Sequence, residues 1–373
     1  MTPADAYIDS LQLFGMRFGL ERMHGLLDRL GHPERSFDAI HVVGTNGKGS
    51  TTLYAEALLR AEGVHVGAYL SPHLTSFRER IRIGGAEIDP GAYEAAVLRV
   101  RDAVGADVTQ FEALTAAAFA AFAAAGVRWA VVEAGLGGRL DATNVLARSR
   151  VQVLTNISLE HTELLGETRE AIAAEKLAVV PAGGVVVVGE AGWEGFVPQA
   201  RTLKQVTVAG TYQDQNRAVA LAAVELALGR AIDAAPMDAV RIPGRMEVRG
   251  HDPLEIWDGA HNLAGIGYLL PRLPSREYVL VCSILADKRP EAMLEALSVL
   301  GPTLIATESS NARALRAGDL AARAEPYFQH VEPIPDPFAA RRRALELAGP
   351  KGAVAVTGSL YLLAELSGHG TDP

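Results

Sequence analysis

Short apolar runs alternate along the chain with longer segments of helical periodicity. In the first part of the chain these runs are hydrophobic on both faces and rich in β-branched residues; they are AIHVV (39–43), WAVVE (129–133), VQVL (151–154) and VVVV (185–188). Strands buried on both faces are typical of a parallel sheet covered by helices on each side. A helical pattern between residues 210 and 229, ended by Gly229, predicts the helix that closes this α/β unit.

A second, smaller unit is expected after a stretch rich in proline and glycine. This stretch runs from Asp233 through RIPGRMEVRG, and we expect the boundary after residue 242, giving domains 1–242 and 243–373. The alternation then resumes in shorter form, in LEIW, YVLVC, TLIA, HVEP and AVAVT. The predicted fold class is therefore α/β, with a doubly wound N-terminal unit and a smaller doubly wound C-terminal unit.

Composition excludes several classes of protein. Of the 373 residues, 49% are apolar and 21% are charged, which is typical of a globular chain and argues against disorder. The net charge of −9 argues against nucleic acid as a partner and favours a small-molecule substrate. Without a membrane-length apolar stretch or a secretory signal pattern, we expect a cytoplasmic protein with no membrane role. The single cysteine, Cys282, is expected to be a buried hydrophobic residue.

The sequence GTNGKGST lies between an expected strand and an expected helix, which is the setting of a phosphate-binding loop. Its glycines would let backbone amides turn toward phosphate oxygens, and Lys48 would add a mobile cation. Ser50 or Thr51 would reach a metal ion. Val42 and Gly49 depart from the strict consensus of such loops, so a glycine-rich turn without a ligand is the alternative.

Candidate metal and charge positions follow other predicted strands. Glu133 ends the run WAVVE and is well placed to hold the magnesium ion that accompanies a triphosphate. His161 follows the next strand, and Lys176 lies at the end of a helical segment beyond it. Asp258 and His261 come directly after the strand LEIW, at the end of the second sheet where doubly wound folds bind ligands. Each alone has a structural alternative, such as a loop-capping acid, an Asp-Gly turn or a solvated charge.

Arginines cluster in the sequence TSFRERIRIGG. Arg78, Arg80 and Arg82 alternate at strand spacing, which predicts that all three lie on one face of a strand. That face would be either a solvated edge or a strip that faces an anion.

Taken together, these features favour an ATP-type phosphoryl-transfer enzyme built from two α/β units. They leave the acceptor of the phosphoryl group open. The Asn-Lys-x-Asp signature of GTPases and the His-Arg-Asp and Asp-Phe-Gly motifs of protein kinases are absent from the sequence, which argues against both classes.

A series of motifs, in order along the chain, resembles one family. The motifs are FGLERM, GTNGKGST, YLSPHLTSFRERI, TQFEALT, VVEAGLGGRLDATN, ISLEHTELLG, AAEK, IPGRME, DGAHN, ILADK and TGSLYL, extending from Phe18 to Tyr361. They are similar to those of folylpolyglutamate synthase/dihydrofolate synthase, in the Mur ligase superfamily. The resemblance implies an N-terminal P-loop ATPase domain and a C-terminal Rossmann-like domain, with ATP and substrate meeting between them, in an enzyme that is commonly a monomer.

The resemblance implies an ATP-dependent ligase that adds L-glutamate to a folate carboxylate. The γ-phosphoryl group of ATP would pass to that carboxylate, and the amine of glutamate would attack the resulting acyl phosphate. The acceptor would be a reduced folate, 7,8-dihydropteroate or both, and we favour both because FGLERM and TQFEALT are present for a pterin. The carboxylates of glutamate need cationic partners, for which Lys288 and Arg313 are open choices.

Roles for individual residues also follow from the resemblance. ATP would be held by Thr45, Asn46, Gly47, Lys48, Gly49, Ser50, Asn216, Arg245, Asp258 and His261, and magnesium by Ser50, Ser71, Glu133 and His161. The catalytic set would be Lys48, Glu133, His161 and Lys176, of which Lys176 matches a lysine that is often carbamylated in this family; a monovalent cation is a further expectation. The pterin would lie against Phe18, Gly19, Leu20, Glu21, Arg22, Thr109, Gln110, Phe111, Glu112, Arg139 and Asp141.

Two rival hypotheses remain at this level. A Mur-type ligase would add an amino acid to a cell-wall precursor by the same chemistry, but FGLERM and TQFEALT argue against it. A catalytically inactive nucleotide-binding or scaffold protein would not need Lys48, Glu133, His161 and Lys176. The chain departs from the family mainly between Val185 and Tyr212, where many relatives are longer and carry an additional hairpin.

Overall fold

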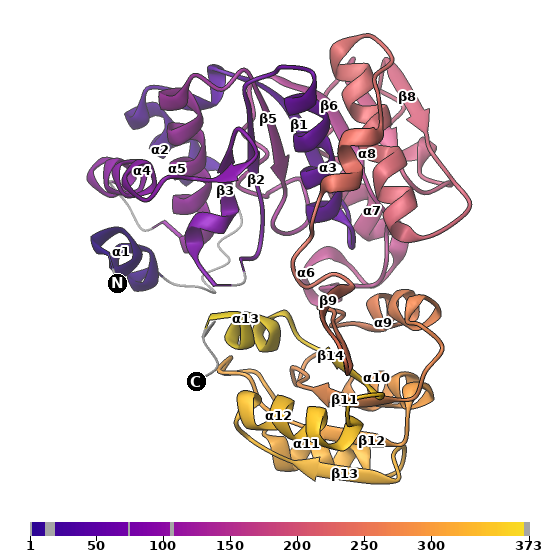
Figure 1. The fold of residues 1–373 in the computed structure, drawn as a ribbon. Coiled ribbons are helices and arrows are strands. Elements are labelled where there is room, and N and C mark those ends of the chain that lie inside the picture. Colours follow the sequence, from indigo (N-terminus) through magenta and orange to yellow (C-terminus); the bar gives the residue numbers. More distant parts are fainter. Residues whose placement is uncertain (1, 12–18, 74, 105–107, 369–373) are drawn as a thin grey trace. The chain divides into compact units, whose positions relative to one another are not determined.

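The chain divides into two compact units, Met1–Val240 and Arg241–Pro373. The computed structural model describes residues 2–11, 19–73, 75–104 and 108–368. Figure 1 draws the first unit from indigo to pink and the second from orange to yellow. The sequence places this boundary after residue 242, and each unit is described separately below.

The first unit is built on an eight-stranded sheet with the order β4-β3-β2-β5-β1-β6-β7-β8. The pairs from β2 to β8 are parallel, and β3 and β4 add an antiparallel hairpin at one edge. The strands are β1 (Asp38–Val43), β2 (Val66–Tyr69), β3 (Ile81–Ile83), β4 (Ala86–Glu87), β5 (Trp129–Glu133), β6 (Ser149–Leu154), β7 (Val185–Val188) and β8 (Thr202–Gln205). The predicted parallel sheet is confirmed, whereas the hairpin was not predicted.

Helices cover both faces of this sheet (Figure 1). Strands β1 and β5 alternate, so that Ala39 and Ala130 pack toward α5 while the intervening residues face α3 and α8. The helices are α1 (Pro3–Ser10), α2 (Glu21–Leu30), α3 (Lys48–Ala61), α4 (Pro90–Ala103), α5 (Gln110–Ala125), α6 (Thr162–Leu165), α7 (Arg169–Leu177) and α8 (Tyr212–Leu228). Helix α8 is the predicted closing helix, and it ends at Gly229 in the left-handed conformation that glycine favours.

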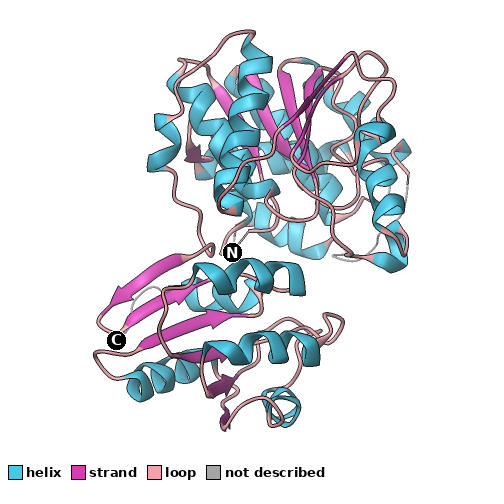
Figure 2. Cartoon of the chain, turned by 90° about the vertical axis from the view of Figure 1, so that its right-hand side faces the viewer, coloured by secondary structure: helices cyan, strands magenta, loops and turns pink. Residues whose placement is uncertain are grey.

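The second unit is a smaller six-stranded sheet with the order β13-β12-β11-β14-β10-β9, in which only the edge strand β9 is antiparallel. Figure 2 shows helices on both faces of this sheet. The strands are β9 (Glu247–His251), β10 (Leu254–Trp257), β11 (Tyr278–Cys282), β12 (Thr303–Ala306), β13 (His330–Pro333) and β14 (Ala353–Thr357). The helices are α9 (Leu263–Leu269), α10 (Pro290–Leu297), α11 (Ala317–Ala324), α12 (Pro337–Ala348) and α13 (Leu360–Gly368). The α/β class predicted for both units is confirmed.

The lone cysteine is a core residue, as predicted. Cys282 is fully buried in β11 among apolar side chains, and this burial raises the pKa of its thiol to about 12.

The prediction for the arginine cluster is wrong. Arg78 and Arg80 lie in a 3-10 turn (Phe77–Arg80), and only Arg82 lies in a strand, β3. The Ser76 side chain caps the turn, and this local hydrogen bonding competes with an extended strand. Arg80 is buried and donates to His73 Nδ1 at 2.9 Å, whereas Arg82 donates to Glu56 at 2.8 Å, so the guanidinium groups do not form one strip.

Among the residues described, no helix combines the length and the apolar character needed to cross a bilayer.

Candidate functional site

The glycine-rich loop lies between β1 and α3, and its backbone is held in conformations that need glycine. Gly47 has φ of 83°, and a Cβ atom there would lie 2.4 Å from Asn216 Oδ1. A Cβ atom on Gly44 would lie 1.8 Å from Thr155 Oγ1. The short distance from Gly47 places Asn216 of α8 beside the loop. The loop leads into the N-terminus of α3, and its glycines lie in close contact with Thr155 and Asn216.

The segment after β6 holds this loop from the other side. The Thr45 amide donates to Asn156 O and the Asn46 amide donates to Asn156 Oδ1, both at 2.9 Å. The Ser158 amide donates to Thr45 Oγ1 at 3.0 Å, and Thr155 Oγ1 donates to Asn46 O at 2.7 Å. The sequence analysis missed Asn156, whose partners lie in a distant part of the chain. Its position directly after a predicted strand was the only signal.

Two lysine ammonium groups converge on one carbonyl of the loop. Lys48 Nζ donates to Gly44 O and Thr45 O at 3.1 Å, and Lys176 Nζ donates to Gly44 O at 2.8 Å. Lys176 is only 4% exposed. Its burial, reinforced by the positive charge of Lys48, lowers the pKa of Lys176 to about 7. A neutral amine is therefore available at this position near physiological pH.

Glu133, at the end of β5, lies beside the loop with its carboxylate almost fully buried, at 3% exposure. Its Oε2 accepts a hydrogen bond of 2.9 Å from the Ser71 amide, and a Cβ atom on Gly49 would lie 3.4 Å from the same oxygen. Ser50 is buried in the first turn of α3, where Gln213 Nε2 reaches its Oγ at 3.5 Å. Glu133 thus lies against both Ser71 and the glycine loop.

This donor set suits a cation that is shared with phosphates. Magnesium in nucleotide sites takes oxygen ligands, commonly one or two carboxylates together with phosphate oxygens and water. Within the described ranges, no three His, Cys, Asp or Glu side chains gather closely enough to form a metal site by themselves. One buried carboxylate beside the glycine loop fits magnesium that arrives with a nucleotide better than a permanent metal centre.

His161 lies close to two glutamates at the start of α6. It precedes α6 with φ of 50°, and its Nε2 is 3.4 Å from Glu160 Oε1 while its Nδ1 is 3.9 Å from Glu163 Oε1. Glu160 also acts on Lys176, whose pKa it raises against the stronger effect of burial. His161 therefore belongs to the neighbourhood of Lys176 through Glu160.

The two predicted pterin segments meet through an ion pair. Arg22 of α2 lies 2.9 Å from Glu112 of α5, with both side chains largely buried. Glu21 begins α2, directly after Gly19 and Leu20. Phe18 lies outside the described residues. The structure thus joins the segment after Phe18 to TQFEALT, which the sequence grouped only by resemblance.

Polar groups of TQFEALT hold the start of α5 and its contact with α1. Thr109 and Glu112 cap the start of α5 reciprocally, and Gln110 Nε2 donates to Ile8 O at 3.1 Å. Phe111 instead faces the glycine turn after β5, because a Cβ atom on Gly135 would lie 2.5 Å from its ring. Phe111 is therefore the member of this segment that contacts the turn following Glu133.

Arg139 and Asp141 end the same turn and differ in their surroundings. Arg139 is exposed and its Nε lies 3.1 Å from Glu175 Oε2. Asp141 is buried and accepts the amides of Leu136 at 2.8 Å and Thr143 at 2.9 Å, so it closes the turn on itself. Burial raises the pKa of Asp141, although these hydrogen bonds oppose the rise.

The predicted nucleotide residues of the second unit also lie together. Asp258, directly after β10, accepts the amides of Met246 and Ala260, both at 2.9 Å. Burial raises the pKa of this carboxyl, and the charge of Arg245 opposes the rise. A Cβ atom on Gly259 would lie 2.7 Å from a guanidinium nitrogen of Arg245, and His261 Nδ1 lies 2.9 Å from Gly259 O. Asp258 thus joins the segment that carries Arg245 to the turn that carries His261.

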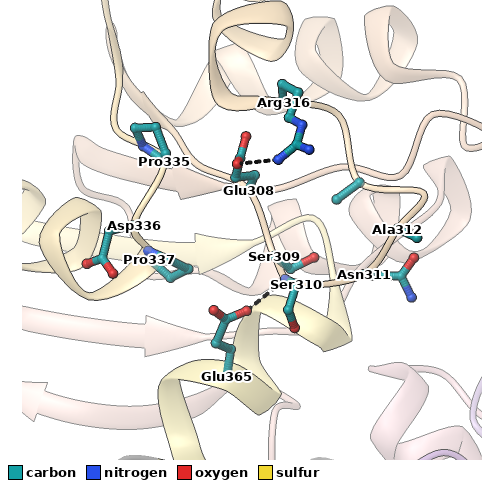
Figure 3. Close-up of a pocket in the computed structure, with 11 residues that line it drawn as sticks. Glu308, Ser309, Ser310, Asn311, Ala312, Arg316, Pro335, Asp336, Pro337 and Glu365 are labelled. Atoms are coloured by element: carbon teal, nitrogen blue, oxygen red, sulfur yellow. Dashed lines mark hydrogen bonds and ion pairs between the residues drawn. The ribbon is translucent and has the colours of Figure 1, made fainter.

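A cavity of about 350 Å³ opens at the carboxyl ends of β12 and β13 and contains none of the predicted site residues (Figure 3). Its carboxylates have structural partners. Glu308 accepts the Ala317 amide at 2.8 Å, Asp336 accepts the Ala339 amide at 2.6 Å, and Glu365 accepts the Ser310 amide at 2.9 Å. The first two cap the helices α11 and α12, so this acidic lining is explained by the fold.

Comparisons with known proteins indicate the family of the chain. Two family descriptions match the chain: Mur ligase middle domain over residues 42–190, and Mur ligase, glutamate ligase domain, over residues 244–360. The chain is 30% identical to the dihydrofolate synthase/folylpolyglutamate synthase of Bacillus subtilis, over 97% of both chains. It is 32% identical to a probable bifunctional folylpolyglutamate synthase/dihydropteroate synthase of Haloferax volcanii, over 96% of this chain but 49% of the relative. The chain therefore spans about half the length of that haloarchaeal protein.

Solved structures are similar over nearly the whole chain. The folylpolyglutamate synthase of Mycobacterium tuberculosis complexed with ADP has a TM-score of 0.90 and 31% identity, covering 99% of this chain and 98% of that one. FolC of Escherichia coli in complex with DHPP and ADP has a TM-score of 0.89 and 28% identity, with coverage of 98% and 97%. A bifunctional folylpolyglutamate synthase/dihydrofolate synthase with Mn, AMPPNP and L-glutamate bound has a TM-score of 0.87 and 29% identity, with coverage of 98% of this chain and 97% of that one.

The family descriptions, the relatives and the solved structures agree on one family. The chain belongs to the folylpolyglutamate synthase/dihydrofolate synthase family of the Mur ligase superfamily, a family of ATP-dependent ligases.

Proposed function

We propose that this chain joins L-glutamate to reduced folates and also to 7,8-dihydropteroate, at the expense of ATP. One observation carries the proposal: Lys48, Lys176 and Glu133 gather around a glycine loop that ends at a helix N-terminus. The complexes of relatives support it, since one holds DHPP with ADP and another holds AMPPNP with L-glutamate. The names of the relatives favour folate over a cell-wall precursor as the acceptor.

The loop region supplies what phosphoryl transfer to a carboxylate requires. Loop amides and Lys48 would neutralise the phosphates of ATP, with Thr45, Asn46, Gly47, Gly49 and Ser50 lining them. The γ-phosphoryl group passes to the substrate carboxylate, which gives an acyl phosphate and ADP. The amine of L-glutamate then attacks the acyl carbon, an amide forms, and phosphate leaves with the electron pair of the broken C–O bond.

Glu133, Ser50 and Ser71 would hold magnesium, with His161 as a further ligand in the loaded enzyme. Bound in this way, magnesium would add positive charge beside the phosphates. The buried carboxylate of Glu133, which accepts the Ser71 amide and lies close to Gly49 of the loop, is the support for this assignment. A monovalent cation near the same loop is also part of the proposal.

Lys176 is the proposed site of carbamylation. The neutral amine adds to carbon dioxide and loses a proton, which turns a cation into an anion. The support is its burial beside Lys48, because a carbamate would replace repulsion between two ammonium groups by attraction.

The substrate residues are proposed from the contacts that join their segments. The pterin would lie against the segment of Gly19, Leu20, Glu21 and Arg22, against Thr109 to Glu112, and against Arg139 and Asp141; Phe18 belongs to the proposal by sequence only. The ion pair between Arg22 and Glu112 and the contact of Phe111 with the turn after β5 support this grouping. Asn216, Arg245, Asp258 and His261 are proposed to hold the nucleotide.

We further propose that the protein is a cytoplasmic monomer, that its substrates are small molecules, and that it does not bind nucleic acid. The net charge of −9 supports the last part, because phosphate backbones are bound by basic surfaces.

The test is ADP release by the purified chain with ATP, magnesium and L-glutamate, with dihydropteroate or tetrahydrofolate as the acceptor. We expect release with each acceptor, loss of release in Lys48→Ala, and no change in Lys204→Ala, a lysine of the same unit that is 43% exposed. Release with one acceptor only would restrict the function to one of the two activities. Release with neither would overturn the proposal.

A further inference from the structure

We propose that Glu190 and Arg169 are positioning residues for the phosphate loop, acting through the backbone of Ile157. This inference rests on the proposed function only in taking the glycine loop as the nucleotide site. Neither residue belongs to the motifs that identified the family, and Glu190 lies in the segment directly after β7.

The loop rests on residues 155–158, and Ile157 lies at the centre of that support. Asn156 on one side accepts the Thr45 and Asn46 amides, and Ser158 on the other side exchanges hydrogen bonds with Thr45. A rotation of the Ile157 peptide groups would move both of these neighbours, and the loop with them. The orientation of this one residue therefore controls the first two residues after Gly44.

Both backbone groups of Ile157 are held by one ion pair. The Ile157 amide donates to Glu190 Oε2 at 2.8 Å, and the Ile157 carbonyl accepts from Arg169 Nε at 3.2 Å and from Arg169 Nη2 at 3.1 Å. Arg169 also pairs closely with Glu190 Oε1. Hydrogen bonds to charged partners are stronger than neutral ones, and the paired geometry fixes the direction of the peptide.

Trp193 fixes the ion pair in turn. Its indole Nε1 donates to Glu190 Oε2 at 3.1 Å, and the guanidinium carbon of Arg169 lies 5.1 Å from the centre of its ring. Trp193 is itself buried and packs edge-on against Phe196, with ring centres 5.7 Å apart. A rigid aromatic residue therefore anchors two side chains that would otherwise be free to choose other rotamers.

The arrangement favours a positioning role over a contribution to global stability. The side chains of Glu190 and Arg169 are 33% and 45% exposed, and ion pairs at this exposure contribute little to the free energy of folding. Their described contacts are with the Ile157 backbone, with each other and with Trp193. Loss of the pair should therefore disturb the loop while leaving the fold intact.

The experiment compares Glu190→Ala, Glu190→Gln and the control Glu225→Ala. Glu225 forms an ion pair of the same unit, with Lys204 at 3.4 Å, and its side chain is 26% exposed. We expect Glu190→Ala to weaken ADP binding, measured by titration calorimetry, about tenfold and to raise the KM for ATP by a similar factor. The KM for tetrahydrofolate and the unfolding midpoint should stay at their wild-type values. Glu190→Gln, whose amide oxygen can still accept the Ile157 N–H, should recover most of the ADP affinity.

Three outcomes would overturn the inference: unchanged ADP affinity in Glu190→Ala, an equal loss in Glu225→Ala, or parallel rises in the KM for ATP and for tetrahydrofolate. If Glu190→Ala does not fold, Arg169→Ala removes the contact with the Ile157 carbonyl and is held to the same criteria. If the wild-type chain binds ADP but forms no ADP from ATP in the presence of folate acceptors, the proposed function is wrong and this inference still holds.

Discussion

The carboxyl edges of the two sheets differ in how their charged side chains are compensated. At the edge of the first sheet, Lys48 and Lys176 both donate to the carbonyl of Gly44, so two like charges share one acceptor. At the edge of the second sheet, Asp258 accepts two backbone amides, and Glu308 combines an amide with the guanidinium of Arg316. The carboxylates of the second edge are compensated by backbone amides and by one guanidinium group, whereas the two ammonium groups of the first edge repel each other.

The difference shows where a ligand is needed to complete the electrostatics. A buried lysine that lies close to another lysine is destabilised in its charged form, which is why the pKa of Lys176 falls to about 7. An arrangement of this kind is typical of functional sites, because bound phosphates or a chemical change can neutralise it. A carboxylate that caps a turn or a helix has no such requirement.

The largest expected effect concerns Lys176. Lys176→Met removes the proposed carbamate and one of the two cations, so we expect kcat with folate acceptors to fall at least about a hundredfold. Lys204→Met is the matched control and should keep wild-type turnover. Full activity of Lys176→Met would show that the lysine pair at the first edge is not needed for the reaction.

The same residue also gives a dependence of stability on pH. Because the pKa of Lys176 in the folded chain is about 7 and its ordinary value is 10.5, the unfolded chain binds more protons between these values. The free energy of unfolding should therefore rise with pH across this window, and Lys176→Met should lose that rise. Denaturant titrations at pH 7 and pH 9 measure both slopes, and equal slopes in the two proteins would contradict the assignment.

An intermediate effect is expected from Gly47→Ala. The substitution strains a left-handed backbone, at about 1–2 kcal/mol, and brings a methyl group against Asn216 Oδ1. Gly63→Ala is the matched control, since Gly63 has φ of 73° but open space around its Cβ position. Both variants should lose similar stability in thermal unfolding, but only Gly47→Ala should weaken ADP binding, about tenfold by calorimetry. Equal ADP affinities would show that the loop tolerates the shift.

The smallest effect is expected at the second edge. Glu308→Gln keeps an acceptor for the Ala317 amide but loses the charge beside the start of α11 and beside Arg316. The free energy of unfolding should fall by about 0.5 kcal/mol, with unchanged ADP affinity. The exposed Glu295 of α10 provides the control, Glu295→Gln. A loss of ADP affinity in Glu308→Gln alone would give the cavity a role that its helix caps do not explain.

Much of the fold could be predicted because the strands buried on both faces are continuous apolar runs. The parallel strands β1, β5, β6 and β7 follow those runs closely, and α8 ends at its predicted glycine. The hairpin of β3 and β4 was missed because its strands have three and two residues, too few to show a period. The strand predicted from the spacing of the arginines was wrong because five residues are too few to distinguish a strand from a capped 3-10 turn.

Prediction of the site was uneven for a similar reason. Lys48 and Glu133 could be predicted from the local sequence, because one lies in a glycine loop and the other at the end of a buried strand. Asn156, Arg169 and Glu190 have no local signature, because their partners are hydrogen-bonding groups brought close only by the folded chain. The ion pair between Arg22 and Glu112 likewise spans two helices that the sequence linked only by family resemblance.

The single cysteine makes this chain convenient for chemical labelling. Cys282 is fully buried and the pKa of its thiol is raised to about 12, so the folded protein offers almost no thiolate to an alkylating reagent. A cysteine introduced at an exposed position would thus carry a fluorophore or spin label selectively, without prior removal of the native thiol. The native thiol, in turn, reacts only when the second unit opens, which makes it an intrinsic reporter of unfolding in that half of the chain.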